Sequence, residues 1–379
     1  MTSSHPAALC FEPIGELGDR PHLIVDGAPR RGTLRTLSHW PATPTPPELA
    51  RDTSAEIVLA YLDHPEYWAS GAQAVTCDHL DEDGALALYG VVDPAGARLA
   101  ANRLVDAAHA GDFQVVRSPE GAEVAWALRH LFDPTRSVLA EALEPAARSG
   151  ARWEALALRR SLEILPELLG APERFRSWWE EEALAYQASV SLVETGAVLI
   201  EERRDLDLAV VRVQGSAAPS RFARIGRDVP LPLHPAAIHS VTRASRVLIG
   251  QERSYTYYDR YETWVRYVSR RLPLRRDLGE LAQRLSQAER DGATWCADAP
   301  ATLIPVLRLA KGAPSSLSVA QVTQLIGEHL EDRPGVWAPF RDEGAYVGSG
   351  RIEGSGLSGS GAPRAGTTGR GLARWRGRR

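Results

Sequence analysis

The stretch Gln73-Ala-Val-Thr-Cys-Asp-His-Leu-Asp-Glu-Asp-Gly84 joins two apolar segments of the chain. Residues 72–77 are apolar and partly β-branched, which is typical of a buried strand. Residues 85–92 are apolar and begin with good helix formers, which predicts a buried helix. In open α/β sheets, ligands gather beyond the carboxyl ends of the strands. We therefore expect a ligand site where this strand turns into the helix.

Four potential metal ligands lie within six residues of this turn: Asp78, His79, Asp81 and Asp83. Alternating carboxylates at a strand end can converge on one hard cation, and carboxylate oxygen suits Mg²⁺ and Mn²⁺. Two such ions about 3.5–4 Å apart can generate hydroxide and stabilise an in-line displacement at phosphorus. In the plainer interpretation, Asp81 and Asp83 only cap a helix. That helix would start at Gly84 or Ala85, and His79 would only hydrogen-bond within the loop.

A second group of potential ligands belongs to a predicted helix over residues 97–110, which ends near residues 111–112. Asp106 and His109 are three residues apart and share one face of a helix. We expect Asp106 and Asp112 to complete the metal site with the first group. His109 would act in catalysis with Asp81 and Asp83. A solvated helix end is the alternative interpretation of these downstream residues.

Other polar residues also follow predicted strands. Asp26 ends a strand over residues 22–26 and would face the same crevice, although an Asp-Gly turn is the simpler interpretation. His39 lies in the segment 33–40, which alternates apolar and polar residues, and a lone histidine is more often structural. Nearby arginines would contact an anion only if the sheet brings them to the metal: Arg30, Arg31 and Arg35.

The pattern as a whole predicts an α/β protein. Its parts are an N-terminal parallel-sheet domain with helices (1–120), a helical segment that continues or links it (121–204), a smaller α+β domain with a β-hairpin (205–340), and a disordered Gly/Ser/Arg tail (348–379). Thr53-Ser-Ala-Glu56 matches a capping box and predicts a helix start. The other predicted elements are a short strand at 113–116, strands at 206–213 and within 246–268 with a turn at 258–260, and helices at 278–290 and 318–331.

Composition excludes several classes of protein. A formal net charge of −4 gives no global attraction to nucleic acid or anionic membranes. No run approaches the roughly eighteen apolar residues that span a bilayer, and no signal peptide precedes residue 16, so we expect a cytoplasmic protein without a membrane partner. The three cysteines have no spacing typical of a disulfide framework or zinc site. No Walker-type or Gly-x-Gly-x-x-Gly loop indicates a nucleotide cofactor.

His79-Leu-Asp81-Glu-Asp83-Gly84, between a strand and a small-residue helix, resembles the first motif of the DHH phosphoesterases. The resemblance implies a two-domain α/β protein with two Mn²⁺ or Mg²⁺ ions that hydrolyses phosphodiester or pyrophosphate bonds. It also implies basic residues from the second domain at the substrate. The chain lacks the Asp-His-His triplet that bridges metal in that family, and Asp63-His64 precedes the first motif. Residues 21–116 also resemble an uncharacterised bacterial family, with Leu37-Ser-His-Trp40 upstream of the acidic motif.

These observations predict a metal-dependent phosphoesterase-like hydrolase that acts on a phosphodiester or pyrophosphate. Its expected partner is a small phosphorylated substrate or a short oligonucleotide. Candidate phosphate contacts in the distal domain are His234, His239, Arg243 and Arg246. The missing triplet favours the alternative of a catalytically degenerate DHH-like binding or scaffold protein. Nucleic-acid binding through the aromatic hairpin and the basic tail is disfavoured by the acidic net charge.

Overall fold

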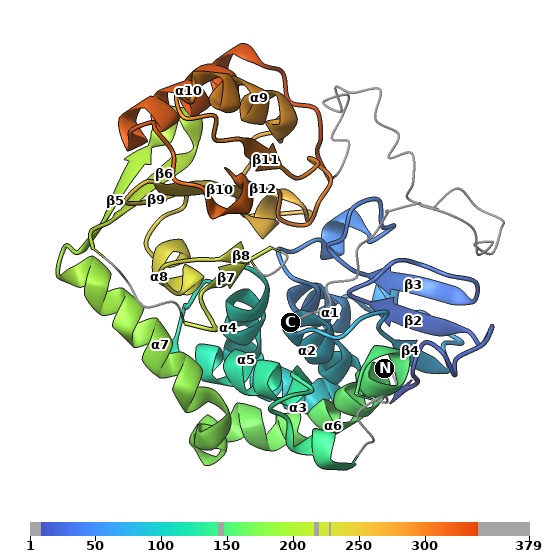
Figure 1. The fold of residues 1–379 in the computed structure, drawn as a ribbon. Helices are drawn as coiled ribbons and strands as arrows, with labels where there is room; N and C mark the ends of the chain where they lie inside the picture. The colour runs from blue at the N-terminus through green and yellow to red at the C-terminus, as the bar shows by residue number, and fades with distance from the viewer. Residues whose placement is uncertain (1–8, 143–147, 216–219, 227–228, 340–379) are drawn as a thin grey trace. The chain divides into compact units, whose positions relative to one another are not determined.

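The computed structural model describes residues 9–142, 148–215, 220–226 and 229–339 (Figure 1). The predicted Gly/Ser/Arg tail lies outside these residues. The chain forms two compact units, and each is discontinuous in sequence. The first unit comprises Met1–Glu194, Leu233–Arg243 and Val265–Arg271, and the second comprises Thr195–Pro232, Ala244–Trp264 and Leu272–Arg379. The architecture is mixed α/β, as the sequence predicts.

A four-stranded parallel sheet organises the first unit, in the order β1-β4-β2-β3. Its strands are β1 (Cys10–Phe11), β2 (His22–Val25), β3 (Thr33–Leu37) and β4 (Ala74–Thr76). Every residue of β2 and β4 is buried, as expected for strands of a parallel sheet covered on both faces. Because the strands are parallel, their carboxyl ends meet at one edge of the sheet.

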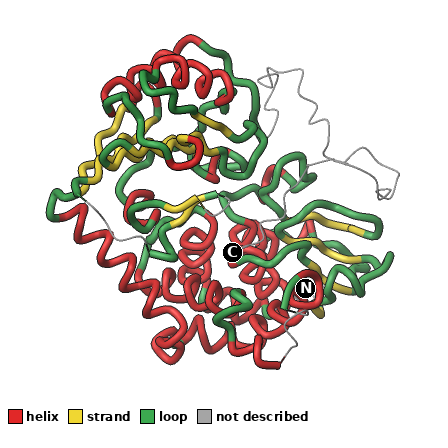
Figure 2. Tube along the Cα trace, in the orientation of Figure 1, coloured by secondary structure: helices red, strands yellow, loops and turns green. Residues whose placement is uncertain are grey.

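Helices make up most of the first unit, as Figure 2 shows in red. They are α1 (Ser54–Asp63), α2 (Glu82–Val92), α3 (Pro94–Leu99), α4 (Ala101–Asp112), α5 (Pro119–Phe132), α6 (Gly150–Gly170), α7 (Arg176–Glu194) and α8 (Pro235–His239). The predicted capping box is confirmed, since Thr53 and Glu56 exchange hydrogen bonds at the start of α1. Helix α2 is buried from Glu82 to Val91, so it runs through the core of this unit.

The second unit contains a mixed six-stranded sheet in the order β11-β12-β10-β9-β6-β5. Its strands are β5 (Val198–Arg203), β6 (Leu208–Val213), β9 (Arg246–Gln251), β10 (Ser254–Asp259), β11 (Trp295–Ala297) and β12 (Val306–Leu309); β7 (Arg224–Ile225) and β8 (Val229–Pro230) pair separately. Helices α9 (Leu278–Ala288) and α10 (Val319–Asp332) pack with this sheet in one apolar core. Tyr255 and Tyr257 belong to that core, and Tyr258 is buried as well.

Several predicted elements differ from the structure. The hairpin β9–β10 turns at Glu252 and Arg253, not at residues 258–260, because the polar Glu252 adopts the left-handed conformation that a tight turn requires. The helix predicted over residues 97–110 is two helices separated at Ala100. Residues 113–116 form no strand, since the amides of Phe113 and Val115 both bond to the carbonyl of His109 and close α4.

Two helix ends also differ. Helix α2 begins at Glu82, so Asp83 lies inside its first turn, whereas the capping interpretation put the start at Gly84 or Ala85. Helix α7 ends at Glu194, short of the end of the helical segment predicted over 121–204, because Gly196 turns the chain with a φ of +77°. Within the described ranges, no helix has the length and apolar character required to cross a membrane.

Candidate metal centre

Polar side chains from four segments of the chain converge at the carboxyl edge of the parallel sheet. Asp26 follows β2, and His39 follows β3 by two residues. The segment 77–83 follows β4 and enters α2, and Asp112 is the last residue of α4. This is the edge at which open α/β sheets bind their ligands. Strand order therefore brings together residues that are distant in sequence.

One half of the cluster surrounds His39. Its Nε2 lies 3.4 Å from Oδ1 of Asp26 and 3.4 Å from Oδ2 of Asp112. Oδ2 of Asp83 is 3.8 Å from the same nitrogen. All four side chains are buried, and Asp112, the most accessible, exposes only 6% of its side chain. Three carboxylates thus face one imidazole nitrogen away from solvent.

The other half surrounds His79. Its Nε2 lies 3.2 Å from Oδ2 of Asp26 and 2.5 Å from Oδ2 of Asp81. Ligand atoms of Asp26, Cys77 and His79 lie within 4.8 Å of one another. The Asp26 carboxylate therefore has one oxygen near each of the two histidines, and it connects the halves of the cluster.

Backbone groups hold the carboxylates in place. Asp83 accepts hydrogen bonds from the amides of Ser54 (2.7 Å) and Ala55 (2.9 Å), at the start of α1. Ser54 also donates through its hydroxyl to Oδ1 of Asp26, at 2.7 Å. Asp81 accepts from the amide of Gly84 (2.8 Å) and caps α2. The two acids of the motif therefore do cap helices, but each caps a different one, and each also faces a histidine.

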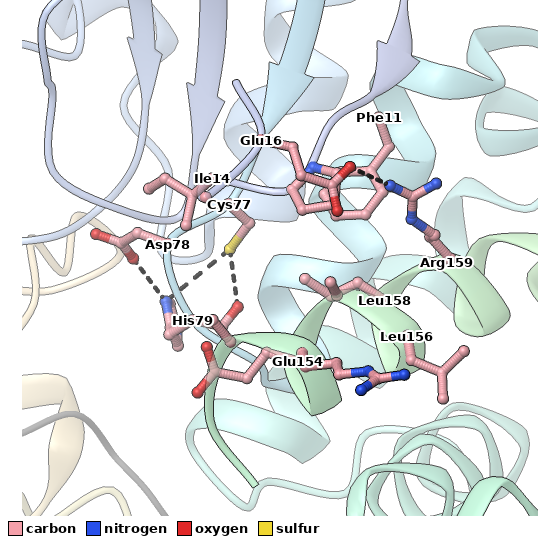
Figure 3. Close-up of a pocket in the computed structure, with 15 residues that line it drawn as sticks. Phe11, Ile14, Glu16, Cys77, Asp78, His79, Glu154, Leu156, Leu158 and Arg159 are labelled. Carbon is pink, nitrogen blue, oxygen red and sulfur yellow. Dashed lines mark hydrogen bonds and ion pairs between the residues drawn. The ribbon is translucent and has the colours of Figure 1, made fainter. Parts of the chain in front are cut away.

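The far side of each imidazole has its own acceptor. His39 donates through Nδ1 to the carbonyl of Asp52 at 2.5 Å, which directs Nε2 at the acids. His79 donates through Nδ1 to Oδ1 of Asp78 at 3.0 Å (Figure 3). Metal-binding histidines commonly use their second nitrogen in this way, which fixes the ring orientation.

The acids shift one another's pKa values. Burial, together with the charge of Asp26, raises the pKa of Asp83 to about 8. Burial and the charges of Asp83 and Asp81 raise the pKa of Asp112 well above its ordinary value. Asp81 has a raised pKa as well, with burial as the main cause. The site therefore gathers more negative charge than its own side chains neutralise.

The histidines compensate for only part of this charge. Burial alone would raise the pKa of Asp26, but hydrogen bonds from His39 and His79 outweigh burial and bring it well below the ordinary value. Burial lowers the pKa of each histidine, and the neighbouring carboxylates outweigh that effect and raise both. In the part of the chain that the structure describes, no arginine or lysine forms an ion pair with any acid of this cluster.

These donors fit a hard divalent cation. Four carboxylates and two imidazoles are the ligand types that Mn²⁺ accepts, and carboxylates alone suit Mg²⁺. Among the described residues, Oδ2 of Asp112 is buried and has no hydrogen-bond partner. Buried charges are normally paired or coordinated to a metal. Burial raises the pKa of Cys77 to about 12, so its thiol is a poor ligand beside these oxygens. The buried Asp/His cluster could therefore hold a metal ion.

Two glycines allow the close packing of this centre. A Cβ atom on Gly84 would lie 2.8 Å from Sγ of Cys77 and 3.4 Å from Oδ2 of Asp26. A Cβ atom on Gly111 would lie 2.7 Å from Cβ of Glu82, in the first turn of α2. Gly111 thus lets the end of α4 approach α2 closely enough to bring Asp112 to the cluster.

The structure unites some of the sequence-predicted site residues and separates others. His79, Asp81, Asp83 and Asp112 lie in the cluster. Asp106 instead accepts a hydrogen bond from the Ser118 hydroxyl at 2.6 Å, and His109 contacts Glu56 at 3.2 Å. The predicted roles of Asp106 as a ligand and of His109 in catalysis have no support in this geometry, because each side chain is engaged elsewhere.

Asp26 and His39 were not in the predicted ligand set, although both are central to the cluster. Their position is the signal that indicates them, since Asp26 directly follows β2 and His39 follows β3 by two residues in a parallel sheet. Asp26 also makes the simpler Asp-Gly turn, with a φ of +42° that aspartate tolerates. Turn and ligand roles coexist at this residue.

Six of the seven arginines and histidines predicted as candidate anion or phosphate contacts have partners outside the cluster. Arg30 donates to the carbonyl of Ile14, and Arg35 donates to the carbonyl of Tyr67. Arg31 pairs with Asp19. In the distal sequence, His234 contacts Glu182, His239 contacts the Phe113 carbonyl, and Arg246 donates to the Leu206 carbonyl. None of these contacts involves the acids of the cluster.

Comparison with known proteins gives a family but no activity. A model of a protein family of unknown function (DUF6687) matches residues 7–340. No curated protein and no solved structure matches the chain.

Proposed function

Because the chain belongs to DUF6687, a family of unknown function, we propose its activity from the chemistry of the centre: it is a metal-dependent hydrolase of phosphodiester or pyrophosphate bonds. The observation that carries the proposal is the Asp26 carboxylate, which lies 3.4 Å from Nε2 of His39 and 3.2 Å from Nε2 of His79. One acid in contact with both halves of a buried acidic cluster is suited to bridging two cations.

Two groups of residues would hold the ions. Their members are Asp26, His39, Asp83 and Asp112 for one ion, and Asp26, His79 and Asp81 for the other. Bound Mn²⁺ or Mg²⁺ would supply Lewis-acid activation of water and stabilisation of charge at phosphorus. Four buried carboxylates are a poor environment for an anionic substrate until cations neutralise them, so the proposal requires metal for substrate binding as well.

The exposure of the cluster's side chains indicates the side from which the substrate approaches. His79 and Asp81 expose 8% and 14% of their side chains, whereas His39 and Asp83 are fully buried. The phosphoryl group would therefore approach from the side of His79 and Asp81. In the reaction, a water oxygen bonds to phosphorus, the bond from phosphorus to one ester oxygen breaks, and that oxygen takes a proton from the water.

The test combines Mn²⁺ calorimetry with hydrolysis of bis(p-nitrophenyl) phosphate, using the full chain. Asp26→Asn keeps the shape and tolerates the left-handed backbone, but it removes the bridging charge. We expect at least about a tenfold loss in Mn²⁺ affinity and loss of hydrolysis. Asp106→Asn, a carboxylate on α4 that bonds to Ser118 outside the cluster, is the matched control.

Three results would overturn the proposal. If the wild-type chain binds no Mn²⁺ or Mg²⁺, the cluster is not a metal centre. If it binds metal but cleaves neither diesters nor pyrophosphate, the alternative of a degenerate binding protein holds instead. If Asp26→Asn and Asp106→Asn lose equal affinity, the metal lies elsewhere.

A further inference from the structure

A pocket of about 410 Å³ adjoins the cluster at His79 (Figure 3). Three segments of the first unit line it: the turn after β1, the turn after β4 and the N-terminal half of α6. Cys77, Asp78 and His79 form its wall on the side of the centre. The pocket therefore borders the cluster at His79, one of its more accessible residues.

Most of the remaining wall is apolar. It is formed by Phe11, Pro13, Ile14, Ala155, Leu156 and Leu158. Charged groups are also present, and two of them neutralise each other, because Arg159 pairs with Glu16 at 2.7 Å. A pocket with apolar walls and a few polar groups is typical of sites for small organic molecules, and its volume lies within their usual range.

We propose that this pocket binds the organic group of the substrate, so that the enzyme prefers phosphate esters that carry an apolar, ring-sized substituent. The inference rests on the proposed hydrolase activity, since the phosphoryl group must lie at the metal centre for the substituent to reach the pocket. His79 supplies the connection, because its Nε2 faces Asp26 and Asp81 while the residue itself lines the pocket. The Phe11 and Ile14 side chains supply surface against which a ring can pack.

Two glycines permit a matched test. Gly15 lines the pocket, Gly170 ends α6 outside it, and a Cβ atom on either residue meets nothing within 4 Å. Gly15→Trp should fill the pocket without disturbing its surroundings, and Gly170→Trp is the control. Ala151→Trp, at an exposed position that also lines the pocket, provides a second variant if Gly15→Trp fails to fold.

The substrates are phenyl p-nitrophenyl phosphate and methyl p-nitrophenyl phosphate, which share a leaving group and differ only in the retained substituent. With the Mn²⁺-loaded chain, we expect kcat/KM to be at least about tenfold higher for the phenyl ester. Gly15→Trp should abolish that preference through KM and leave the methyl ester within about twofold of wild type. Gly170→Trp should leave both esters unchanged.

The outcomes separate the two proposals. If the Mn²⁺-loaded chain cleaves neither ester, nor bis(p-nitrophenyl) phosphate, nor pyrophosphate, the hydrolase proposal fails. If it cleaves one of the latter two but neither ester, only the pocket proposal fails. If both are cleaved without preference for the phenyl ester, or if Gly15→Trp and Ala151→Trp affect both esters equally, the hydrolase stands and the pocket is not its substituent site.

Discussion

His39 Nε2 lies 3.4 Å from Oδ2 of Asp112, although one residue follows β3 and the other ends α4. The orientation of His39 is imposed from behind by the carbonyl of Asp52, at 2.5 Å from Nδ1. Asp112, in contrast, has no hydrogen bond at this oxygen from any described residue. Its carboxylate contributes charge to the cluster without capping a helix, unlike Asp81 and Asp83.

Asp112→Asn should therefore change metal binding and stability in opposite directions. Without metal, removal of one buried charge next to Asp83 and Asp81 should raise the free energy of unfolding by about 1 kcal/mol. With Mn²⁺, the variant should gain less stability than wild type, because a ligand has been lost. Thermal unfolding with and without Mn²⁺ measures both effects. Equal stabilisation by Mn²⁺ in the two proteins would exclude Asp112 as a ligand.

We expect Gly111→Ala to show that the close approach of α4 to α2 is required for stability and for Mn²⁺ binding. The new methyl group would lie 2.7 Å from Cβ of Glu82, a position that cannot swing away. We expect a loss of about 1–3 kcal/mol in the free energy of unfolding and weaker Mn²⁺ binding, because Asp112 is displaced with the helix end. Gly170→Ala, where the methyl group meets open space, should be neutral or stabilising by up to about 1 kcal/mol. Urea unfolding measures both variants, and equal losses in the free energy of unfolding would contradict this prediction.

Local patterns predicted much of the fold. The capping box at Thr53 and the apolar run before Asp78 depend on near neighbours in sequence, and the structure has α1 and β4 where these patterns indicate them. The turn of the β9–β10 hairpin was misplaced because its residues, Glu252 and Arg253, are not typical turn formers. Propensity is a weak guide where pairing between strands decides the register.

The cluster could be only half predicted, for a related reason. His79, Asp81 and Asp83 lie in one short segment and form a recognisable pattern. Asp26 and His39 reach the cluster only through the strand order β1-β4-β2-β3, which no local pattern specifies. Asp106 and His109 satisfied the helical spacing, but Ser118 and Glu56, which no local pattern assigns to them, are their partners.

Arg129→Gln should be among the most destabilising substitutions in the first unit. The guanidinium donates to Glu82 on α2 at 2.7 Å and to Glu182 on α7, and both acids are buried. Burial raises the pKa of Glu82, whereas the charge of Arg129 outweighs burial at Glu182 and lowers its pKa. Without the arginine, two buried carboxylates lose their counter-charge, and we expect a loss of about 3–5 kcal/mol. Arg160→Gln removes an exposed pair with Glu163 and should cost less than about 1 kcal/mol in the same urea titration.

His329 gives the second unit a pH dependence. It is fully buried on α10, and burial lowers its pKa, an effect that the charge of Glu280 only partly offsets. The unfolded chain therefore takes up a proton more readily than the folded chain, and stability falls as the pH drops below the ordinary histidine pKa of about 6.5. Between pH 7.5 and 5.5, wild type should lose up to about 1 kcal/mol more stability than His329→Leu.

The difference between the pH profiles of wild type and His329→Leu isolates the contribution of His329, because the two proteins share every other titrating group, including His39 and His79. Urea unfolding at pH 7.5 and at pH 5.5 measures the free energy of unfolding of each protein. Parallel profiles for wild type and His329→Leu would mean that the folded chain accommodates the charged imidazole as well as water does, and burial would then not control its protonation.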